Sequence, residues 1–198
     1  DGYFGCWNYN TWANLRSSGW DHFQTTDTYT RCAGWYKNGA VDSFCYYEVG
    51  FFIFDTSSLN SSDIISSATF SLNIKSKVDD GTVNPTLHIG ILPNQPNNFP
   101  DWWEDIMETN VSCASLTWGG FSSSGYYNFS LNASGISNIQ KDGLTGFTTR
   151  TNNDLYNSTP SGNGGWTYWE SYFSDQGDGY KPKLTVVSSP PTSPTVTT

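Results

Sequence analysis

Short segments in which apolar and polar residues alternate recur along the chain. The clearest are FSLNI at 70–74, LHIGI at 87–91 and YNFSL at 127–131. A period of two residues is typical of strands that bury one face. Turn-forming residues separate these segments, and only 101–109, which follows Pro100, suits a helical turn. Many short strands at this spacing predict an all-β fold, an antiparallel jelly-roll-like β-sandwich.

The length of 198 residues suits one domain. We expect the sandwich at 21–187, an aromatic N-terminal extension at 1–20 and a tail rich in proline, threonine and serine at 188–198, with both extensions ordered.

The composition of the chain excludes some classes of binding partner. The net charge is -9 and the nine Lys and Arg residues are scattered, which argues against binding of nucleic acid. No apolar run approaches the ~18 residues that a membrane helix needs, so we expect no membrane span.

Four cysteines, Cys6, Cys32, Cys45 and Cys113, form an even set with no C-x-x-C pair and no nearby histidine. This pattern favours disulfides over a zinc site. Three connectivities are open; we favour Cys32 with Cys45, which closes a short loop, and Cys6 with Cys113, which ties the N-terminal extension to the domain.

Five N-x-S/T sequons occur, at Asn60, Asn110, Asn128, Asn132 and Asn157. Such sequons are acceptors for N-glycans in secreted proteins. Together with the cysteines they predict an extracellular or cell-surface glycoprotein.

Six segments occur in an order that carries a resemblance. They are FFIFDTSSL (51–59), SSATFSLNI (66–74), DWWED (101–105), SLTWGG (115–120), GLTGFTTR (143–150) and YFSDQGDGYKPKLTVV (172–187). From Asp27 to Val187 the chain resembles the DNRLRE-type domain, a family with disaggregatase-related and carbohydrate-binding modules of bacterial and archaeal surface proteins. The resemblance implies a jelly-roll sandwich in a secreted or surface protein, with glycan binding in some members. Where the family usually places a basic residue ahead of the FFIFD strand, this chain has YYEV at 46–49, which puts a sugar site that depends on that charge in doubt.

The sequence gives no positive case for an enzyme. His22 and His88 lie far apart, and the alternation places His88 on the outward side of its strand. The acidic group in DWWEDIMET, namely Asp101, Glu104, Asp105 and Glu108, spans only one or two turns, whereas glycosidase carboxylates face each other across a sugar. A solvated turn or a cation site is the better interpretation of that group.

A structural calcium ion is the one cofactor that the sequence suggests, and none is required. Asp175, Asp178 and the backbone of SDQGDG could supply oxygen ligands from one loop. The same residues also form ordinary turns.

Aromatic residues reach 17% and crowd the N-terminal region, where no alternation explains them. Their broad apolar faces and polar tips suit stacking on a sugar or a contact between subunits, or they cover one end of the sandwich. The candidate contact residues are Trp7, Trp12, Trp20, Trp35 and Tyr36. We expect Trp118, Trp166 and Trp169 to pack in the core or at its rim.

The tail contains Pro190, Pro191, Pro194 and Val196 and predicts an extended segment that could lie along a neighbouring subunit. Head-to-tail exchange of such segments generates a filament. We therefore expect a non-enzymatic, glycosylated structural subunit that associates with itself in an extracellular filament or surface assembly. The alternative is a carbohydrate-binding module whose exposed Trp and Tyr residues stack on a polysaccharide.

Overall fold

A computed structural model describes residues 1–7, 9–17, 22–25, 29–39, 42–81, 83–92, 106–107, 109–122, 124–162 and 164–191. Its strands are β1 (Gly2–Cys6), β2 (His22–Gln24), β3 (Tyr29–Lys37), β4 (Phe44–Asp55), β5 (Ile64–Asp79), β6 (Thr86–Ile91), β7 (Ser112–Thr117), β8 (Gly125–Ser130), β9 (Leu144–Thr151), β10 (Gly165–Tyr172) and β11 (Lys183–Ser189). Short helices occur at α1 (Trp12–Ser17), α3 (Ala133–Ser137) and α4 (Asn152–Leu155), with 3-10 turns at η2 (Trp118–Gly120) and η3 (Ser174–Gln176).

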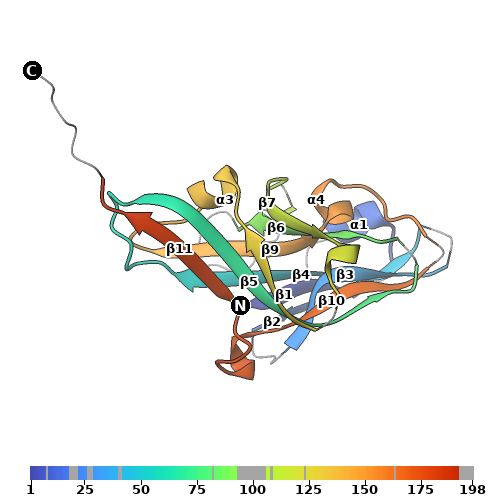
Figure 1. Cartoon of the computed structure of the whole chain (residues 1–198). Coiled ribbons are helices and arrows are strands. Elements are labelled where there is room, and N and C mark those ends of the chain that lie inside the picture. Colours follow the sequence, from blue (N-terminus) through green and yellow to red (C-terminus); the bar gives the residue numbers. More distant parts are fainter. Residues whose placement is uncertain are drawn as a thin grey trace, which may run out of the picture.

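The strands form one antiparallel sheet that is nearly closed into a sandwich. Hydrogen-bonded neighbours follow the order β11-β5-β10-β3-β4-β9-β6-β7, with β8 on β5 and β1 on β4. Figure 1 shows β6, β7 and β9 in the upper layer and β1, β3, β4 and β10 in the lower layer. The predicted all-β sandwich is confirmed.

Two long strands link the layers. β4 pairs with β3 through residues 44–49 and with β9 through 50–55, and β5 pairs in the same way with β11 through 64–71 and with β10 through 74–79. Because one long strand serves two successive neighbours, the sheet can split into layers without a chain break. The lower layer thereby carries β10, β3, β4 and β1 side by side.

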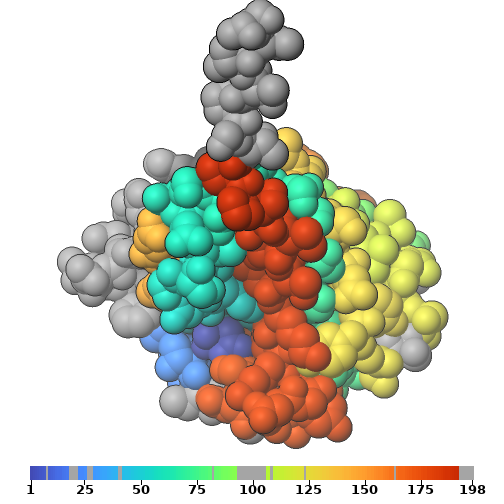
Figure 2. Space-filling view, turned by 60° about the vertical axis from the view of Figure 1, so that its left-hand side comes forward, coloured from blue at the N-terminus to red at the C-terminus, as the bar shows by residue number. Residues whose placement is uncertain are grey.

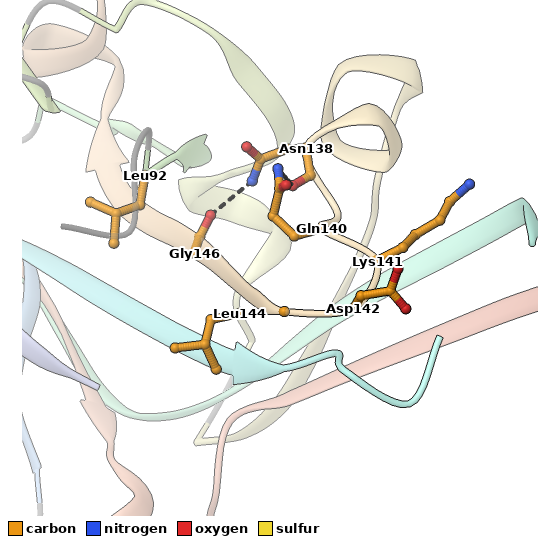
Figure 3. A pocket seen from close by; sticks show the side chains of 8 residues that line it. Leu92, Asn138, Gln140, Lys141, Asp142, Leu144 and Gly146 are labelled. Carbon is orange, nitrogen blue, oxygen red and sulfur yellow. Dashed lines mark hydrogen bonds between the residues drawn. The ribbon is translucent and has the colours of Figure 1, made fainter. Parts of the chain in front are cut away.

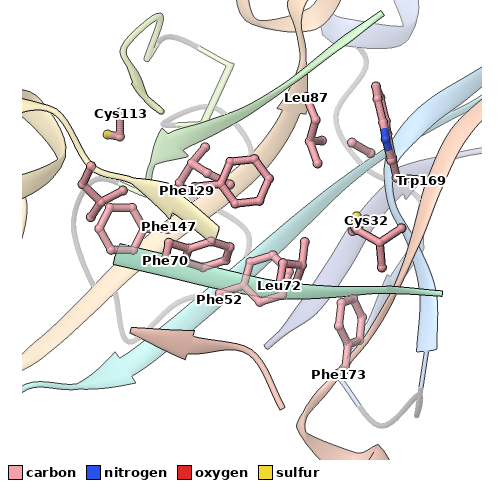
Figure 4. Close-up of a cluster of buried hydrophobic side chains, with 14 of the residues drawn as sticks. Cys32, Phe52, Phe70, Leu72, Leu87, Cys113, Phe129, Phe147, Trp169 and Phe173 are labelled. Atoms are coloured by element: carbon pink, nitrogen blue, oxygen red, sulfur yellow. The ribbon is translucent and has the colours of Figure 1, made fainter. Parts of the chain in front are cut away.

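An inner core fills the space that the sheet encloses (Figure 4). Phe70 lies at its centre, with the rings of Phe52, Phe147 and Phe129 at 5.3, 5.9 and 6.3 Å. The predicted alternation accounts for these positions, because Phe70, Leu72 and Ile74 are all buried. Burial of such rings contributes most of the driving force for folding.

A second core lies between β4 and the N-terminal segment. Trp12 and Leu15 of α1 pack with Trp35, Phe44 and Tyr47 of the lower layer. Residues of the predicted N-terminal extension thus form a strand of the sheet and a helix of the second core.

Buried charges fasten α1 to the rest of the molecule. Asp154 of α4 accepts hydrogen bonds from Arg16 of α1 at 3.1 Å and from Arg150 of β9 at 2.9 Å. Arg150 also donates to the carbonyl oxygens of Ile106 and Thr109. Burial alone would raise the pKa of Asp154, but the charges and hydrogen bonds of the two arginines hold it below its usual value. The network therefore stays ionised at neutral pH.

The predicted disulfides are wrong. Among the described residues, which include all four cysteines, no disulfide forms and each cysteine is a buried thiol. Cys32 lies beside Gly50 of β4. Cys45 precedes Gly50 by five residues on that strand, which separates the two cysteines by roughly 16 Å. A disulfide needs Cα atoms within about 7 Å.

The other predicted pair fails for a different reason. Cys6 belongs to the second core and donates to the carbonyl oxygen of Leu15, whereas Cys113 belongs to the inner core. Burial raises the pKa of Cys32 and of Cys113 to about 12, so both remain protonated thiols. The prediction of an extracellular location then depends on the sequons and on the family resemblance.

The last strand reaches into the predicted tail. β11 runs to Ser189 along one edge of β5, and Figure 2 shows it on the molecular surface next to that strand. Pro190 and Pro191 follow and are exposed. Pro194 and Val196 lie outside the described residues.

Candidate binding face

Four strands place aromatic side chains in a row on one surface of the lower layer. Trp166 of β10 lies opposite Tyr36 of β3, and Tyr36 lies opposite Tyr46 of β4. Trp7 directly follows β1, on the other edge of β4, and its ring lies 5.7 Å from that of Tyr46. Tyr168 is two residues after Trp166 and therefore shares its side of the sheet. We call these five residues the aromatic face.

The rings of the aromatic face support one another and leave one side open to solvent. The centroids of Tyr36 and Tyr46 each lie 4.9 Å from that of Trp166, and Tyr168 lies 5.9 Å from it. These distances are typical of favourable aromatic pairs. Trp7 is 42% exposed and the other four are half-buried. The array is thus both ordered and accessible.

An ion pair anchors the centre of the aromatic face. The guanidinium of Arg31 lies 4.1 Å from the ring centroid of Trp166 and 5.0 Å from that of Tyr168. Its Nη1 donates to a carboxylate oxygen of Glu48 at 3.4 Å. Burial raises the pKa of Glu48 to about 7, although Arg31 and a hydrogen bond from Trp7 lower it. Glu48 therefore connects Arg31 and Trp7 beneath the rings.

Two glycines give these side chains room. Gly34 lies opposite Tyr168, and a Cβ at Gly34 would stand 2.4 Å from the Cβ of Tyr168. Gly5 lies opposite Glu48, and a Cβ at Gly5 would stand 3.1 Å from Nε1 of Trp7. A Cβ at Gly5 would press on the Trp7 indole, which would have to move by a few tenths of an ångström.

The chemistry of the aromatic face is that of rings with polar tips. Among the described residues, the exposed large aliphatic side chains lie on other elements, at Ile64, Val111, Leu144 and Val187. The core of a protein interface is depleted in charged residues, whereas here the Arg31–Glu48 pair lies among the rings. Rings flanked by charged hydrogen-bonding groups suit a ligand with apolar faces and many hydroxyls.

Glu48 is a poor candidate for acid catalysis in spite of its raised pKa. Its side chain is 3% exposed and lies against Arg31. A general acid must come within hydrogen-bonding distance of the substrate. The nearby carboxylate of Glu170 accepts a hydrogen bond from Ser76 at 2.7 Å and pairs with Lys75 at 3.5 Å. The arrangement is suited to binding rather than to proton transfer.

The predicted contact residues divide into two groups. Trp7 and Tyr36 belong to the aromatic face, but Trp12 and Trp35 are 1% and 2% exposed and cannot contact a partner. They pack edge to face in the second core, which α1 covers. Trp20 lies outside the described residues.

Sequence reasoning missed Tyr46, Tyr168 and Trp166, the last of which it assigned to the core or its rim. The segment WTYWESY does carry a signal, because its aromatic and acidic residues at 166, 168, 170 and 172 recur with a period of two. Of the three tryptophans predicted for the core or its rim, Trp169 lies on the opposite side of β10 and is fully buried in the inner core, and Trp118 packs against it.

Each of the two histidines packs against an aromatic ring. His22 stacks on Trp7 with ring centroids 3.7 Å apart, next to the aromatic face. His88 lies on the side of β6 opposite Leu87 and Ile89, but it is buried there because Tyr156 covers it. Burial and the nearby charge of Arg150 lower the pKa of His88 to about 4, so its ring is neutral at physiological pH.

Of the acidic residues that the sequence suggested as catalytic groups or metal ligands, the structure describes only two. Asp101, Glu104, Asp105 and Glu108 lie outside the described residues. Asp175 lies in η3, and Asp178 follows that turn with its side chain 95% exposed and paired with Lys181. Within the described ranges no group of three or more potential metal ligands occurs. Calcium binding therefore stays a prediction.

All five sequon asparagines are exposed. Asn128 is on β8, and Asn132 caps α3 by accepting a hydrogen bond from the backbone of Gly135. The other three lie in connections: Asn60 after β4, Asn110 before β7 and Asn157 after α4. None of the five lies on a strand that contributes to the aromatic face.

A polar hollow of about 410 Å³ lies elsewhere, at the start of β9 (Figure 3). Asn138 donates to the carbonyl oxygen of Gly146 across it at 2.8 Å. Lys141 donates to the carbonyl oxygens of Ser61 and Asp63. Because backbone carbonyls already use these donors, the hollow is a weaker candidate than the aromatic face.

No helix in the described part of the chain has the length and apolar character that a bilayer crossing requires. A scan against models of protein families finds no match to this chain, and a search of curated proteins finds none either. The resemblance to DNRLRE-type domains accordingly stays a prediction.

Proposed function

We propose that the protein is a non-enzymatic carbohydrate-binding module, and that the aromatic face is its binding surface. The observation that carries this proposal is the continuous row of half-exposed rings from Trp166 to Trp7, centred on Arg31. Tryptophan and tyrosine rings can stack on the apolar faces of pyranose rings, while their polar tips and the partly exposed guanidinium of Arg31 can hydrogen-bond to hydroxyls.

Charge favours a neutral glycan over an acidic one. The whole chain carries a net charge of -9, and a polyanion would be repelled by such a field. On the aromatic face itself, Arg31 is balanced by Glu48.

Affinity electrophoresis tests the proposal. The protein would be run in gels that contain β-glucan, xylan or mannan, and in a gel that contains polygalacturonate. We expect retardation in at least one neutral polysaccharide and none in the acidic one. Trp166→Ala should abolish the retardation, whereas Tyr156→Ala, which removes an exposed ring beyond α4, should retain it. Unretarded migration in every neutral gel, or equal retardation of both variants, would contradict the proposal.

A second candidate, a subunit of an extracellular filament, is supported by β11. Among the described strands β11 pairs with β5 alone, so its other edge can accept a strand from a second copy. Electron microscopy of the whole chain beside a version that ends at Pro191 tests this, because that version keeps β11 complete. Filaments that disappear on truncation would support the structural role, and dispersed particles from both would exclude it.

A further inference from the structure

The aromatic face continues along β10 into a second group of rings. Tyr172 is opposite Tyr29 of β3, and their centroids are 6.1 Å apart. Tyr180 lies 4.6 Å from Tyr172. We call Tyr29, Tyr172 and Tyr180 the tyrosine patch. Tyr29 and Tyr180 are 43% and 42% exposed, so this patch is open to solvent as the aromatic face is.

Both groups of rings lie on the same side of the sheet. Trp166, Tyr168, Glu170 and Tyr172 alternate along β10 and therefore point to one side. The register shift after Trp169 is taken up in β3, where Arg31 comes opposite Glu170. The side chains of β10 therefore keep to the same side of the sheet before and after this register shift.

A charged strip separates the two groups. Lys75 pairs with Glu170 at 3.5 Å and lies 3.1 Å from the ring centroid of Tyr29. Arg31 pairs with Glu48 on the other side of the strip. Arg31, Lys75 and Glu170 are partly exposed and thus offer donors and an acceptor, while the buried Glu48 lies against Arg31.

We propose that the aromatic face and the tyrosine patch are two subsites for one linear, neutral polysaccharide chain that lies along β10. Its central sugars contact the charged strip. This inference rests on the proposed function and specifies the ligand further. From Trp166 to Tyr172 the strand spans about 20 Å, so the site requires an extended stretch of several sugars rather than a single terminal sugar.

Chain length is therefore the variable to test. Calorimetric titration would use cello-, xylo- and manno-oligosaccharides from the disaccharide to the octasaccharide. For the series that binds, affinity should rise with length until the chain reaches both subsites. Tyr180→Ala should weaken binding of the longest oligosaccharide about tenfold, as expected for one lost ring, and leave the shortest unchanged. Tyr172→Ala should behave in the same way, and Tyr156→Ala should match the unmodified protein.

Trp166→Ala separates this inference from the proposed function, because it should weaken binding at every length. If affinity does not change with length, or if Tyr180→Ala and Tyr172→Ala weaken all lengths equally, the two-subsite inference is overturned while the binding role of the aromatic face stands. If no oligosaccharide binds at any length, both are overturned.

Discussion

Phe52, Phe70 and Phe147 of the inner core are fully buried, whereas Tyr46 and Trp166 of the aromatic face keep one side open to solvent. Both groups are arrays of rings about 5 to 6 Å apart. They differ in chemistry, because the phenylalanines have no polar atom and the residues of the face each carry one. We infer from this contrast that the aromatic residues of this chain serve two purposes, stability in the inner core and recognition on the aromatic face.

Removal of a core ring should have the largest effect on stability. Phe70→Ala is expected to lower the free energy of unfolding by about 3–5 kcal/mol, because it leaves a cavity among four other rings. Tyr46→Ala, on the aromatic face, should cost roughly 1 kcal/mol. Urea unfolding of both variants measures the contrast, and similar losses would show that the face is part of the core.

A comparable loss is expected where charge is buried. Asp154→Ala leaves Arg150, which is 1% exposed, without its carboxylate partner. Breaking a buried pair in this way typically costs about 3–5 kcal/mol. Thermal unfolding should show a large decrease for Asp154→Ala. The exposed pair of Asp178 and Lys181 offers a control, since Asp178→Ala should leave the melting temperature unchanged. Equal melting temperatures for the two variants would mean that the network does not fasten α1.

Glu48 should make stability depend on pH in a direction unusual for a carboxyl group. Its pKa is raised from 4.5 to about 7. The folded state thus holds its proton more tightly than the unfolded state, and the stabilisation is complete below about pH 4.5 and lost as the pH rises through 7. The loss is on the order of 3 kcal/mol.

Glu48→Gln isolates this effect, because the amide of Gln has the shape of the protonated carboxyl group and can hydrogen-bond but cannot ionise. His88 acts with the opposite sign, since its pKa is lowered to about 4 and stability falls as the pH drops from 6.5 towards that value. Both proteins contain His88, so their difference in unfolding free energy reports Glu48 alone. That difference should grow in favour of Glu48→Gln between pH 5 and pH 8. A constant difference would contradict the buried position of the carboxyl group.

The smallest effect on stability is expected at Gly5. Gly5→Ala places a methyl group against the Trp7 indole and Glu48. Because Trp7 is at the exposed end of the aromatic face, the indole can move by the few tenths of an ångström that are needed, at a cost to folding of less than about 1 kcal/mol. The retardation in a neutral polysaccharide gel should decrease while the melting temperature changes little. A variant that is retarded like the unmodified protein would show that Trp7 is not part of the binding surface.

The fold could be predicted where its cause is local. Alternation within 70–74 and 87–91 identified two strands and apolar residues of the inner core, because each strand carries its own pattern, although the intervening Ser71, Asn73 and His88 are buried as well. No local sequence pattern predicts which residues form the aromatic face. Trp166, Tyr36 and Tyr46 come together through the register of three strands, of which β10 is distant in the sequence from β3 and β4. Alternation gives the side of a residue on its own strand but not its neighbours across the sheet.

The errors have the same origin. Trp12 and Trp35 look exposed in a polar stretch of sequence, but α1 folds back and buries them against Tyr47. Cys32 and Cys45 are close in sequence, yet they lie far apart along paired strands. Proximity in the sequence was taken as proximity in space in the second case, and local polarity as exposure in the first.

The central claim is that recognition belongs to the outer rings and not to the inner ones. The most direct test is a two-dimensional NMR spectrum of the indole N–H groups during titration with cello-, xylo- and manno-oligosaccharides, since it needs no substitution in the binding surface. The account predicts that the resonances of Trp7 and Trp166 shift with at least one series, while those of the buried Trp12, Trp35 and Trp169 stay in place. If the Trp7 and Trp166 resonances do not shift at the highest concentrations to which all three series dissolve, the claim is contradicted.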